Sequence, residues 1–454
     1  MAKHEKFNFK SRVEFLAKVS ELGADIPFSE DIGILLEKFR VAGKTLPNRL
    51  AVHPIEGADA KTDGSPGELT FRRYQRFAAG GSGLIWFEAT AVVPEGKSNP
   101  GQLWLTKNSL DGFKKLVEKT RSAARGSMGS NHDPMLVLQL SHSGRFAKPA
   151  GTPRPVIAQP SPVLDSKLKL ASDYPLIGDE ELDALQEEFV SAAGLAATAG
   201  FDGVDIKACH GYLVSELLAA HTRPGGKYGG SFENRTRFLI ETAKKIREGV
   251  PETFVTCRLN AYDGIPYPHG FGVAKNDDKQ EDLSEPRALV EELIKIGIPV
   301  INISVGVPRH KPYYGRPFDK PVPGASLPDE HPLEGVARLL RITGRLQQAF
   351  PSLPFVGTGY SWLRRFFPNV AAAVIKSGHA SLIGVGREAL AYPDLAAELA
   401  DHGALNPKKV CLTCSGCSRL LSAGGPVGCV VRDKSVYRIP KSLDNASLLK
   451  KSIV

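Results

Sequence analysis

The chain has 454 residues, of which 42% are hydrophobic and 24% are charged, and its formal net charge is +9. This length and composition are ordinary for a soluble globular enzyme and leave room for one large barrel with extensions. No run of eighteen apolar residues is present, and the charged N-terminus MAKHEKFNFKSRVEF lacks the apolar stretch of a secretory signal. We therefore predict a cytoplasmic protein without a membrane span.

The basic charge balance has two interpretations. It can attract anionic ligands, such as a phosphate-bearing cofactor, an acidic substrate or an acidic electron carrier. It can also be a solvated surface that happens to be basic. No dense run of Lys and Arg with interleaved aromatic residues is present, so we expect no nucleic-acid partner.

Residues 1–40 are predicted to form an N-terminal helical extension. Val13, Leu16, Val19 and Leu22 recur there at the spacing of one helix face.

After the extension, apolar strand patterns and amphipathic helix patterns alternate eight times. The predicted strands are Arg49–Pro54, Gly83–Ala91, Met135–Ser141, Gly203–Ala208, Phe254–Leu259, Pro299–Ser304, Pro354–Gly357 and Ser381–Val385. The predicted helices are Glu68–Ala79, Leu110–Arg125, Asp179–Ala199, Glu233–Glu248, Glu285–Ile296, Leu333–Ala349, Ser361–Ser377 and Glu388–Asp401.

This alternation predicts an α/β fold, a (β/α)8 TIM barrel over residues 41–403. A doubly wound open sheet is the alternative, but no glycine-rich turn follows an early strand. The long stretch 143–177 follows the third strand at the face where barrel enzymes place their sites. We therefore expect it to be an active-site loop or lid.

Glycines follow the seventh and eighth predicted strands. The seventh continues into Gly357-Thr358-Gly359, and the eighth runs into Gly386-Arg387. Barrels often bind a phosphate between these two loops, where glycine lets the backbone approach the anion. Glycine is also common in ordinary tight turns, so each pattern alone is weak.

Polar side chains close two other strands. Gln139 lies in LQLSHSGR and Arg258 in TCRLN. A flavin ring needs hydrogen-bonding groups at its pyrimidine edge and a cation near N1, which Gln and Arg supply. A structural salt bridge is an equally good explanation for Arg258.

The fourth strand leads into KACHGYL. There His210 can donate a hydrogen bond to a substrate oxygen, Tyr212 can donate a proton, and Lys207 precedes both. A lone histidine is more often structural, but the end of a barrel strand favours catalysis.

Together these segments resemble the Old Yellow Enzyme family of FMN oxidoreductases. The similar motifs are LPNRLAVHPIEG, LQLSHSGR, KACHGYL with KYGGSFENRTRF, and LIGVGR, in matching order over about residues 40–400. The resemblance implies a barrel with non-covalently bound FMN and NADH or NADPH as an electron donor.

The resemblance also implies roles for single residues. His210 corresponds to the second substrate-anchoring position and Tyr212 to the proton donor. Gln139 and Arg258 correspond to contacts with the flavin ring, and Pro54 and Ile55 to backbone contacts. Gly357, Thr358, Gly359, Gly386 and Arg387 correspond to the phosphate site.

Two residues depart from the family pattern. Lys207 stands where many members carry His, and Glu56 stands where many carry Thr or Cys. Glu56 would oppose an anionic reduced flavin unless it is paired, and Lys207 is a candidate partner. Both side chains can also turn away from the pocket.

Four cysteines, Cys411, Cys414, Cys417 and Cys429, follow the barrel with the spacing C-x2-C-x2-C-x11-C. This pattern favours a four-iron four-sulfur (4Fe–4S) cluster, with zinc as the alternative. It resembles the iron–sulfur branch of the family, which includes trimethylamine dehydrogenase and 2,4-dienoyl-CoA reductase. We therefore predict a cluster-binding segment and tail over residues 404–454.

Three functions fit these features. The leading hypothesis is reduction of an activated C=C bond by FMN. The second is dehydrogenation of an amine-type substrate, with electrons passing through the cluster to a separate soluble carrier. The third is an electron-transfer subunit of a larger complex. A small-molecule substrate is expected, and a homo-oligomer is left open.

Overall fold

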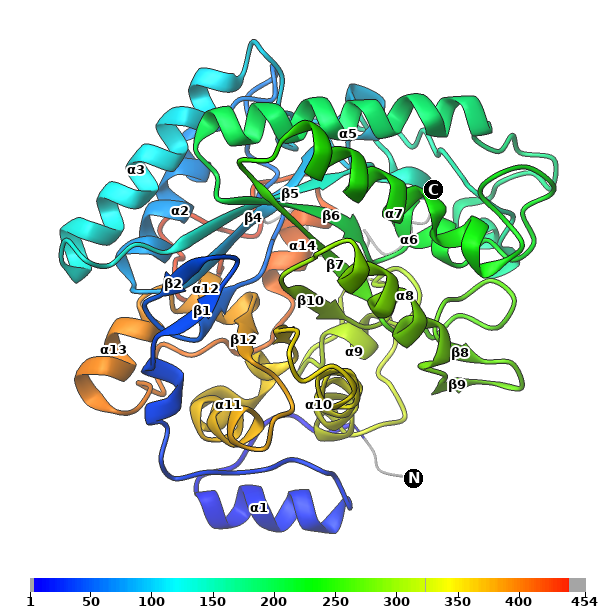
Figure 1. The fold of residues 1–454 in the computed structure, drawn as a ribbon. Coiled ribbons are helices and arrows are strands. Elements are labelled where there is room, and N and C mark those ends of the chain that lie inside the picture. The colour runs from blue at the N-terminus through cyan, green and yellow to red at the C-terminus, as the bar shows by residue number, and fades with distance from the viewer. Residues whose placement is uncertain (1–3, 323, 441–454) are drawn as a thin grey trace.

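A computed structural model describes residues 4–322 and 324–440. At its centre, eight parallel strands close into a barrel, and helices form the outer layer (Figure 1). The strands follow one another around the barrel in chain order, and the last pairs with the first. They are β3 (Leu50–Val52), β4 (Leu84–Ala91), β5 (Met135–Ser141), β6 (Gly203–Ala208), β7 (Phe254–Asn260), β10 (Ile301–Ser304), β11 (Phe355–Gly357) and β12 (Leu382–Val385).

The outer helices occupy the predicted positions between the strands. They are α2 (Glu68–Ala79), α3 (Leu110–Met128), α5 (Asp179–Ala199), α7 (Phe232–Gly249), α8 (Ser284–Lys295), α10 (Pro332–Ala349), α11 (Phe367–Lys376), α12 (Arg387–Ala391) and α13 (Leu395–His402). In α5, Leu182, Leu185 and Phe189 are buried at helical spacing, and Gly200 ends the helix in the left-handed conformation. The predicted (β/α)8 barrel is confirmed.

Two predicted helices are wrong because each is interrupted. The range 361–377 contains the 3-10 helix η4 (Tyr360–Phe366) and then α11, because Arg364 has a non-helical backbone with φ 49° and ψ −124°. The range 388–401 is divided into α12 and α13. Pro393, between them, cannot donate a backbone hydrogen bond to continue the first.

The N-terminal helix α1 (Arg12–Glu21) is present, but its buried face differs from the prediction. Phe15 and Val19 are buried, whereas Val13 is 70% exposed. A 3-10 turn, η1 (Gly33–Leu36), then leads to the barrel.

Two short hairpins were not predicted. The strands β1 (Phe39–Val41) and β2 (Lys44–Leu46) pair, and Val41 and Leu46 pack against the inward residues at the start of the barrel strands. This hairpin spans the predicted boundary at residue 40, and it covers one end of the barrel. The second hairpin, β8 (Val273–Ala274) with β9 (Asp277–Glu281), lies in the loop after β7.

The stretch 143–177 is held in place by buried charges. It contains η3 (Gly144–Phe146) and α4 (Pro162–Leu168). Arg145 donates to Glu216 of α6 (Leu213–Leu218) at 2.9 Å and also to Asp165. The loop is therefore attached to the segment that follows β6.

The segment that follows the barrel and carries the four clustered cysteines packs against helix α2 and the barrel loops. Asp433 pairs with Arg72 and Arg76 of α2 at 2.7 and 2.6 Å. The backbone N–H of Val427 donates to the carbonyl of Gly57 at 2.7 Å, and that of Asp319 donates to Thr413 at 3.1 Å. The remaining short elements are η2 (Pro94–Gly96), α9 (Pro312–Gly315) and α14 (Gly416–Ser422). The last fourteen residues of the predicted segment 404–454 lie outside the described residues.

Within residues 4–322 and 324–440, no helix is long and apolar enough to cross a lipid bilayer.

Candidate active site

A layer of polar side chains fills the barrel above its apolar base. Strand alternation directs Gln139 of β5, Asp205 of β6 and Asn302 of β10 inward. Gln139 Nε2 donates to Asp205 Oδ2 at 2.6 Å, and Asn302 Nδ2 lies 3.2 Å from His53 Nδ1. Burial raises the pKa of Asp205 to about 6, even though the Gln139 amide stabilises its anion.

Next to this layer, Glu56 accepts hydrogen bonds from three side chains. They come from Tyr212 Oη at 2.5 Å, Ser98 Oγ at 2.7 Å and Lys207 Nζ at 3.1 Å. The Glu56 and Lys207 side chains are only 11% and 5% exposed. The predicted pairing of Glu56 with Lys207 is therefore present, and Tyr212 belongs to the same network.

The charges in this network stabilise one another. Burial alone would raise the pKa of Glu56, but the Lys207 charge and the Tyr212 hydrogen bond outweigh it and hold that pKa below its ordinary value. Burial alone would lower the pKa of Lys207, and the neighbouring Tyr212 and Glu56 hold it above its ordinary value. Burial and the Glu56 carboxylate raise the pKa of Tyr212 to about 12, so its hydroxyl stays protonated at neutral pH.

His210 lies on the same loop, in a left-handed backbone conformation with φ 66°. Its Nε2 is 2.9 Å from Ser304 Oγ at the end of β10. Burial and the positive charges of Arg258 and Lys207 hold the pKa of His210 well below its ordinary value. The ring is therefore neutral and carries one N–H donor.

The loops after β11 and β12 carry the residues that the sequence predicts to bind a phosphate. Gly359 has φ 104°, a conformation that side-chain-bearing residues rarely adopt. A Cβ at Gly386 would lie 3.6 Å from Ile55, so this loop adjoins the segment Pro54–Ile55 after β3. Arg387 Nη2 donates to the Pro317 carbonyl at 2.8 Å.

Several buried polar atoms at this end of the barrel have no hydrogen-bond partner among the described residues. They are Nε of Arg258, Nε2 of His53, Oδ1 of Asn302 and Nη1 of Arg387. Buried donors and acceptors are normally paired, so these atoms are suited to contacts with a polar ligand. The cations and glycines are of the kinds that an anionic, ring-bearing cofactor such as FMN requires.

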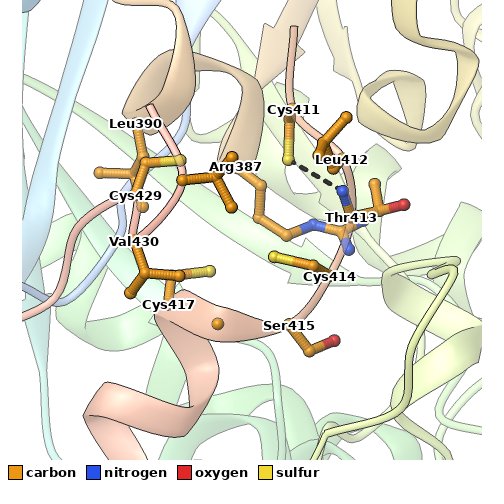
Figure 2. Close-up of a pocket in the computed structure, with 12 residues that line it drawn as sticks. Arg387, Leu390, Cys411, Leu412, Thr413, Cys414, Ser415, Cys417, Cys429 and Val430 are labelled. Atoms are coloured by element: carbon orange, nitrogen blue, oxygen red, sulfur yellow. Dashed lines mark hydrogen bonds between the residues drawn. The ribbon is translucent and has the colours of Figure 1, made fainter. Parts of the chain in front are cut away.

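The four predicted thiols line one cleft together with Arg387 and Thr413. Figure 2 shows their sulfur atoms around one space, with the Arg387 side chain extending across it in this view. Cys411 Sγ accepts a hydrogen bond from the Thr413 N–H at 3.3 Å, and Cys429 Sγ accepts one from Arg432 at 3.3 Å. Across the described ranges, no three metal-ligating side chains stand close enough to hold one metal ion.

Sequence reasoning missed several residues of this region: His53, Ser98, Asp205, Asn302, Ser304 and Arg316. For Asp205 and Asn302 a signal exists, because each is a polar residue between apolar neighbours of a buried strand. Ser98 and Arg316 lie on irregular loops, where no periodicity indicates their direction.

The sequence is similar to a family model and to individual flavin oxidoreductases. The family model described as NADH:flavin oxidoreductase / NADH oxidase matches residues 35–275, more than half of the chain. An NADH oxidase of Thermoanaerobacter brockii is 28% identical over 84% of this chain and 53% of its own length. An NADPH dehydrogenase of Halalkalibacterium halodurans is 32% identical over 62% of this chain and 76% of its own length.

Solved structures share the fold. A 2-naphthoyl-CoA reductase in complex with 2-naphthoyl-CoA has a TM-score of 0.69 at 22% identity, covering 88% of this chain and 57% of that one. Histamine dehydrogenase from Rhizobium sp. 4-9 has a TM-score of 0.65 at 19% identity, covering 89% and 53%. The chain thus spans about half the length of these two proteins and of the NADH oxidase. The matched family model and the barrel show that the chain belongs to the NADH:flavin oxidoreductase / NADH oxidase family of FMN-dependent oxidoreductases.

Proposed function

We propose that the chain reduces an activated C=C bond, with Tyr212 donating the proton. The observation that carries this proposal is the buried network of Tyr212, Glu56 and Lys207 at the barrel mouth. It places a protonated phenol and a fixed cation together at the end of β6, where barrel enzymes carry their catalytic groups.

Bound FMN would supply the hydride to such a reaction. Gln139 and Arg258 would meet its ring, and Pro54 and Ile55 would contact it through their backbone. Its phosphate would be held by two loops. The first contains Gly357, Thr358 and Gly359, and the second contains Gly386 and the Arg387 guanidinium. Nε of Arg258 and Nη1 of Arg387, which find no hydrogen-bond partner among residues 4–322 and 324–440, support this assignment.

The residues of the chain itself orient the substrate and move the proton. His210, held neutral, offers an N–H to a substrate carbonyl oxygen. Lys207 contributes positive potential but is engaged by Glu56 and lies 3.6 Å above the Tyr212 ring. Tyr212 then transfers its proton to the carbon next to the polarised carbonyl.

A second function, dehydrogenation of a substrate, is favoured by one specific contact. Tyr212 donates its hydrogen bond to the Glu56 carboxylate, so the lone pairs of its oxygen remain able to accept. A substrate proton could pass to the Tyr212 oxygen as the Tyr212 proton passes along this hydrogen bond to the Glu56 carboxylate. Electrons would then leave through the cysteine segment to a separate carrier.

We further propose that Cys411, Cys414, Cys417 and Cys429 hold a 4Fe–4S cluster. Backbone N–H groups already donate to two of the sulfur atoms, as they do around such clusters. Around a tetrahedral zinc ion the Zn–S distance is about 2.3 Å, which requires the sulfur atoms to lie about 3.7 Å from one another. In a 4Fe–4S cluster each thiolate binds a different iron, so its thiolates lie farther apart than those around one zinc ion.

Anaerobic purification followed by absorption spectroscopy and by iron, sulfide and flavin assays tests both cofactors. Each chain should contain one FMN and about four iron atoms. Protein that is colourless and takes up no FMN would refute the proposal. Anaerobic bleaching of the flavin by substrate without nicotinamide would favour the dehydrogenase.

Tyr212→Phe tests the proton donor. The oxidative half-reaction should slow by about 10²–10⁴-fold, because the phenol proton is lost, while flavin reduction by NAD(P)H keeps its rate. Stopped-flow absorption separates the two half-reactions. Tyr228→Phe is the matched control, since Tyr228, in the loop before α7, also donates to a carboxylate, that of Asp183 on α5. Unchanged reoxidation by an enone in Tyr212→Phe would contradict the role.

A further inference from the structure

The loop that carries Glu56 is held at the next residue, Gly57, through both of its main-chain polar groups. The Gly57 N–H donates to Glu88 Oε2 of β4 at 2.5 Å. The Gly57 carbonyl accepts from the Val427 N–H at 2.7 Å. Two segments that are distant in the sequence therefore fix the backbone beside the Glu56 carboxylate.

Three buried charged side chains surround Gly57. Arg73 of α2 donates to both carboxylate oxygens of Asp59, at 2.6 and 2.9 Å, and to Glu88 Oε1 at 2.6 Å. The side chains of Arg73, Asp59 and Glu88 are 3%, 5% and 1% exposed. We call these three side chains the Gly57 clamp. Because Asp59 belongs to the same loop as Glu56, the clamp ties that loop to both α2 and β4.

The Arg73 guanidinium lies directly against the main chain of Gly57. A Cβ added at Gly57 would lie 1.9 Å from Arg73 Nη2 and 2.4 Å from Arg73 Cζ. The φ of Gly57 lies outside the left-handed region, so a side chain is excluded there by this contact and not by the backbone conformation. Any residue other than glycine therefore displaces either Arg73 or the loop.

The hydrogen bond to Glu88 acts on the orientation of Glu56 itself. The N–H that donates to Glu88 belongs to the peptide group between Glu56 and Gly57, and a peptide group is planar. Fixing that N–H fixes the Glu56 carbonyl in the same plane, which restricts the backbone of Glu56 on one side. The Glu56 carboxylate meets Tyr212 Oη at 2.5 Å and Lys207 Nζ at 3.1 Å, distances that tolerate little displacement.

The clamp contains two carboxylates and one guanidinium, so its charge is not balanced within the three side chains. Burial raises the pKa of Glu88 to about 7, although the Arg73 charge opposes the rise, and the Asp59 carboxylate adds to it. Tyr74 Oη accepts the backbone N–H of Glu88 at 2.6 Å. Removal of Arg73 would leave two buried carboxylates without a counter-charge, which is strongly destabilising, so smaller changes at Gly57 and Glu88 are the better tests.

We propose that Arg73 and Glu88 are positioning residues that hold the Glu56 carboxylate in place. They fix the peptide group between Glu56 and Gly57, and the carboxylate thereby stays hydrogen-bonded to Tyr212. A displacement of about 1 Å at a reacting group can slow a reaction about 10²-fold, so the clamp matters although it lies outside the reacting atoms. The inference rests on the proposed function, since it concerns the proton donor of that same site.

Gly57→Ala in the FMN-loaded enzyme adds one methyl group at the clamp and removes no charge. With 2-cyclohexen-1-one as the probe, we expect the limiting rate of the oxidative half-reaction to fall about tenfold or more, with a smaller change in the half-saturating enone concentration. Glu88→Gln, whose amide oxygen can still accept the Gly57 N–H, should keep a limiting rate about tenfold or more above that of Glu88→Leu. Stopped-flow absorption measures these rates. Unchanged rates in Gly57→Ala and Glu88→Leu, while Tyr212→Phe slows the reaction, would overturn the proposal.

A double-mutant cycle on thermal unfolding tests the positioning without turnover. Glu56→Gln should lower the melting temperature of the wild type, and it should lower that of Gly57→Ala by less than half as much, because the displaced carboxylate no longer meets its partners. Gly203→Ala is the matched control. Its Cβ would lie 2.4 Å from the Phe254 ring, but at the start of β6, the end of the barrel opposite the mouth. In that variant Glu56→Gln should keep its full effect.

The two measurements separate the inference from the proposed function. Coupling between Gly57→Ala and Glu56→Gln, together with a normal oxidative rate in Tyr212→Phe, would support the clamp and refute the proton donor. Melting-temperature losses that add fully in Gly57→Ala, as in Gly203→Ala, would show that the clamp does not hold Glu56 and would overturn the inference.

Discussion

The two ends of the candidate site differ in how their charges are balanced. At the barrel mouth, Glu56 is surrounded by the hydrogen-bond donors Lys207, Tyr212 and Ser98, all from this chain. At the cysteine end, Arg387 Nη1 and Thr413 Oγ1 are buried without partners in the described ranges. The comparison teaches that the Glu56 network is satisfied by side chains of the protein, whereas the cysteine end keeps buried polar atoms that are free to contact a ligand.

Removing one thiol should change the cysteine end and leave the barrel mouth unchanged. Cys414→Ala should lose the cluster, with iron falling from about four atoms per chain to near zero, because a cubane needs each of its ligands. FMN content should remain at one per chain, since the mouth does not depend on this thiol. Iron and flavin assays on anaerobically purified protein measure both.

Cys257→Ala is the control, because Cys257 is buried within β7 and lies outside the cysteine segment. This variant should retain its iron. Full iron content in Cys414→Ala would show that Cys414 is not a ligand.

Replacing Glu56 tests the balance at the mouth. Glu56→Gln leaves the buried Lys207 ammonium without its counter-charge, and we expect a loss of about 3–5 kcal/mol in the free energy of unfolding. Thermal or denaturant unfolding of the FMN-loaded protein measures it. The double variant Glu56→Gln/Lys207→Met removes both charges and should recover most of the loss. Equal stability of Glu56→Gln and the wild type would mean that the pair is not buried in solution.

A smaller effect is expected from Asp205, below the flavin-ring end. Its pKa of about 6 lies above the ordinary 3.8, so its stabilising contribution is complete below pH 3.8 and is lost as the pH rises through about 6. Asp205→Asn removes this titration, and its stability relative to wild type should improve between pH 4 and pH 8 by up to about 3 kcal/mol. Unfolding across this pH range measures the difference. Asp111→Asn, at an exposed site on α3, is the control, and parallel pH profiles of Asp205→Asn and wild type would contradict the prediction.

The sequence predicted the barrel well because its signal is local and repeated. Every barrel strand is a short run in which nearly all residues are buried and apolar residues alternate with a few inward polar ones, and all eight appear within two residues of the predicted ends. The break at Arg364 was missed because it depends on a tertiary contact: the guanidinium donates to Asp319. The hairpin β1–β2 was missed because its strands have only three residues each.

The candidate site was predictable in its residue types but not in its connections. The charges of Glu56 and Lys207 suggested their pairing across 151 positions of sequence. The participation of Ser98, and the contact of His53 with Asn302, depend on loop paths and barrel register that no single segment encodes. The roles proposed for these residues remain predictions.

The hydrogen bond from Val427 to Gly57 has a consequence for how the two ends communicate. It joins main-chain atoms of the residue next to Glu56 and of the residue two before Cys429. A change of the Val427 side chain removes neither of these main-chain atoms, whereas unfolding of the tail around Cys429 breaks the bond. The position of the loop that carries Glu56 therefore depends in part on the folding of the segment that carries Cys429.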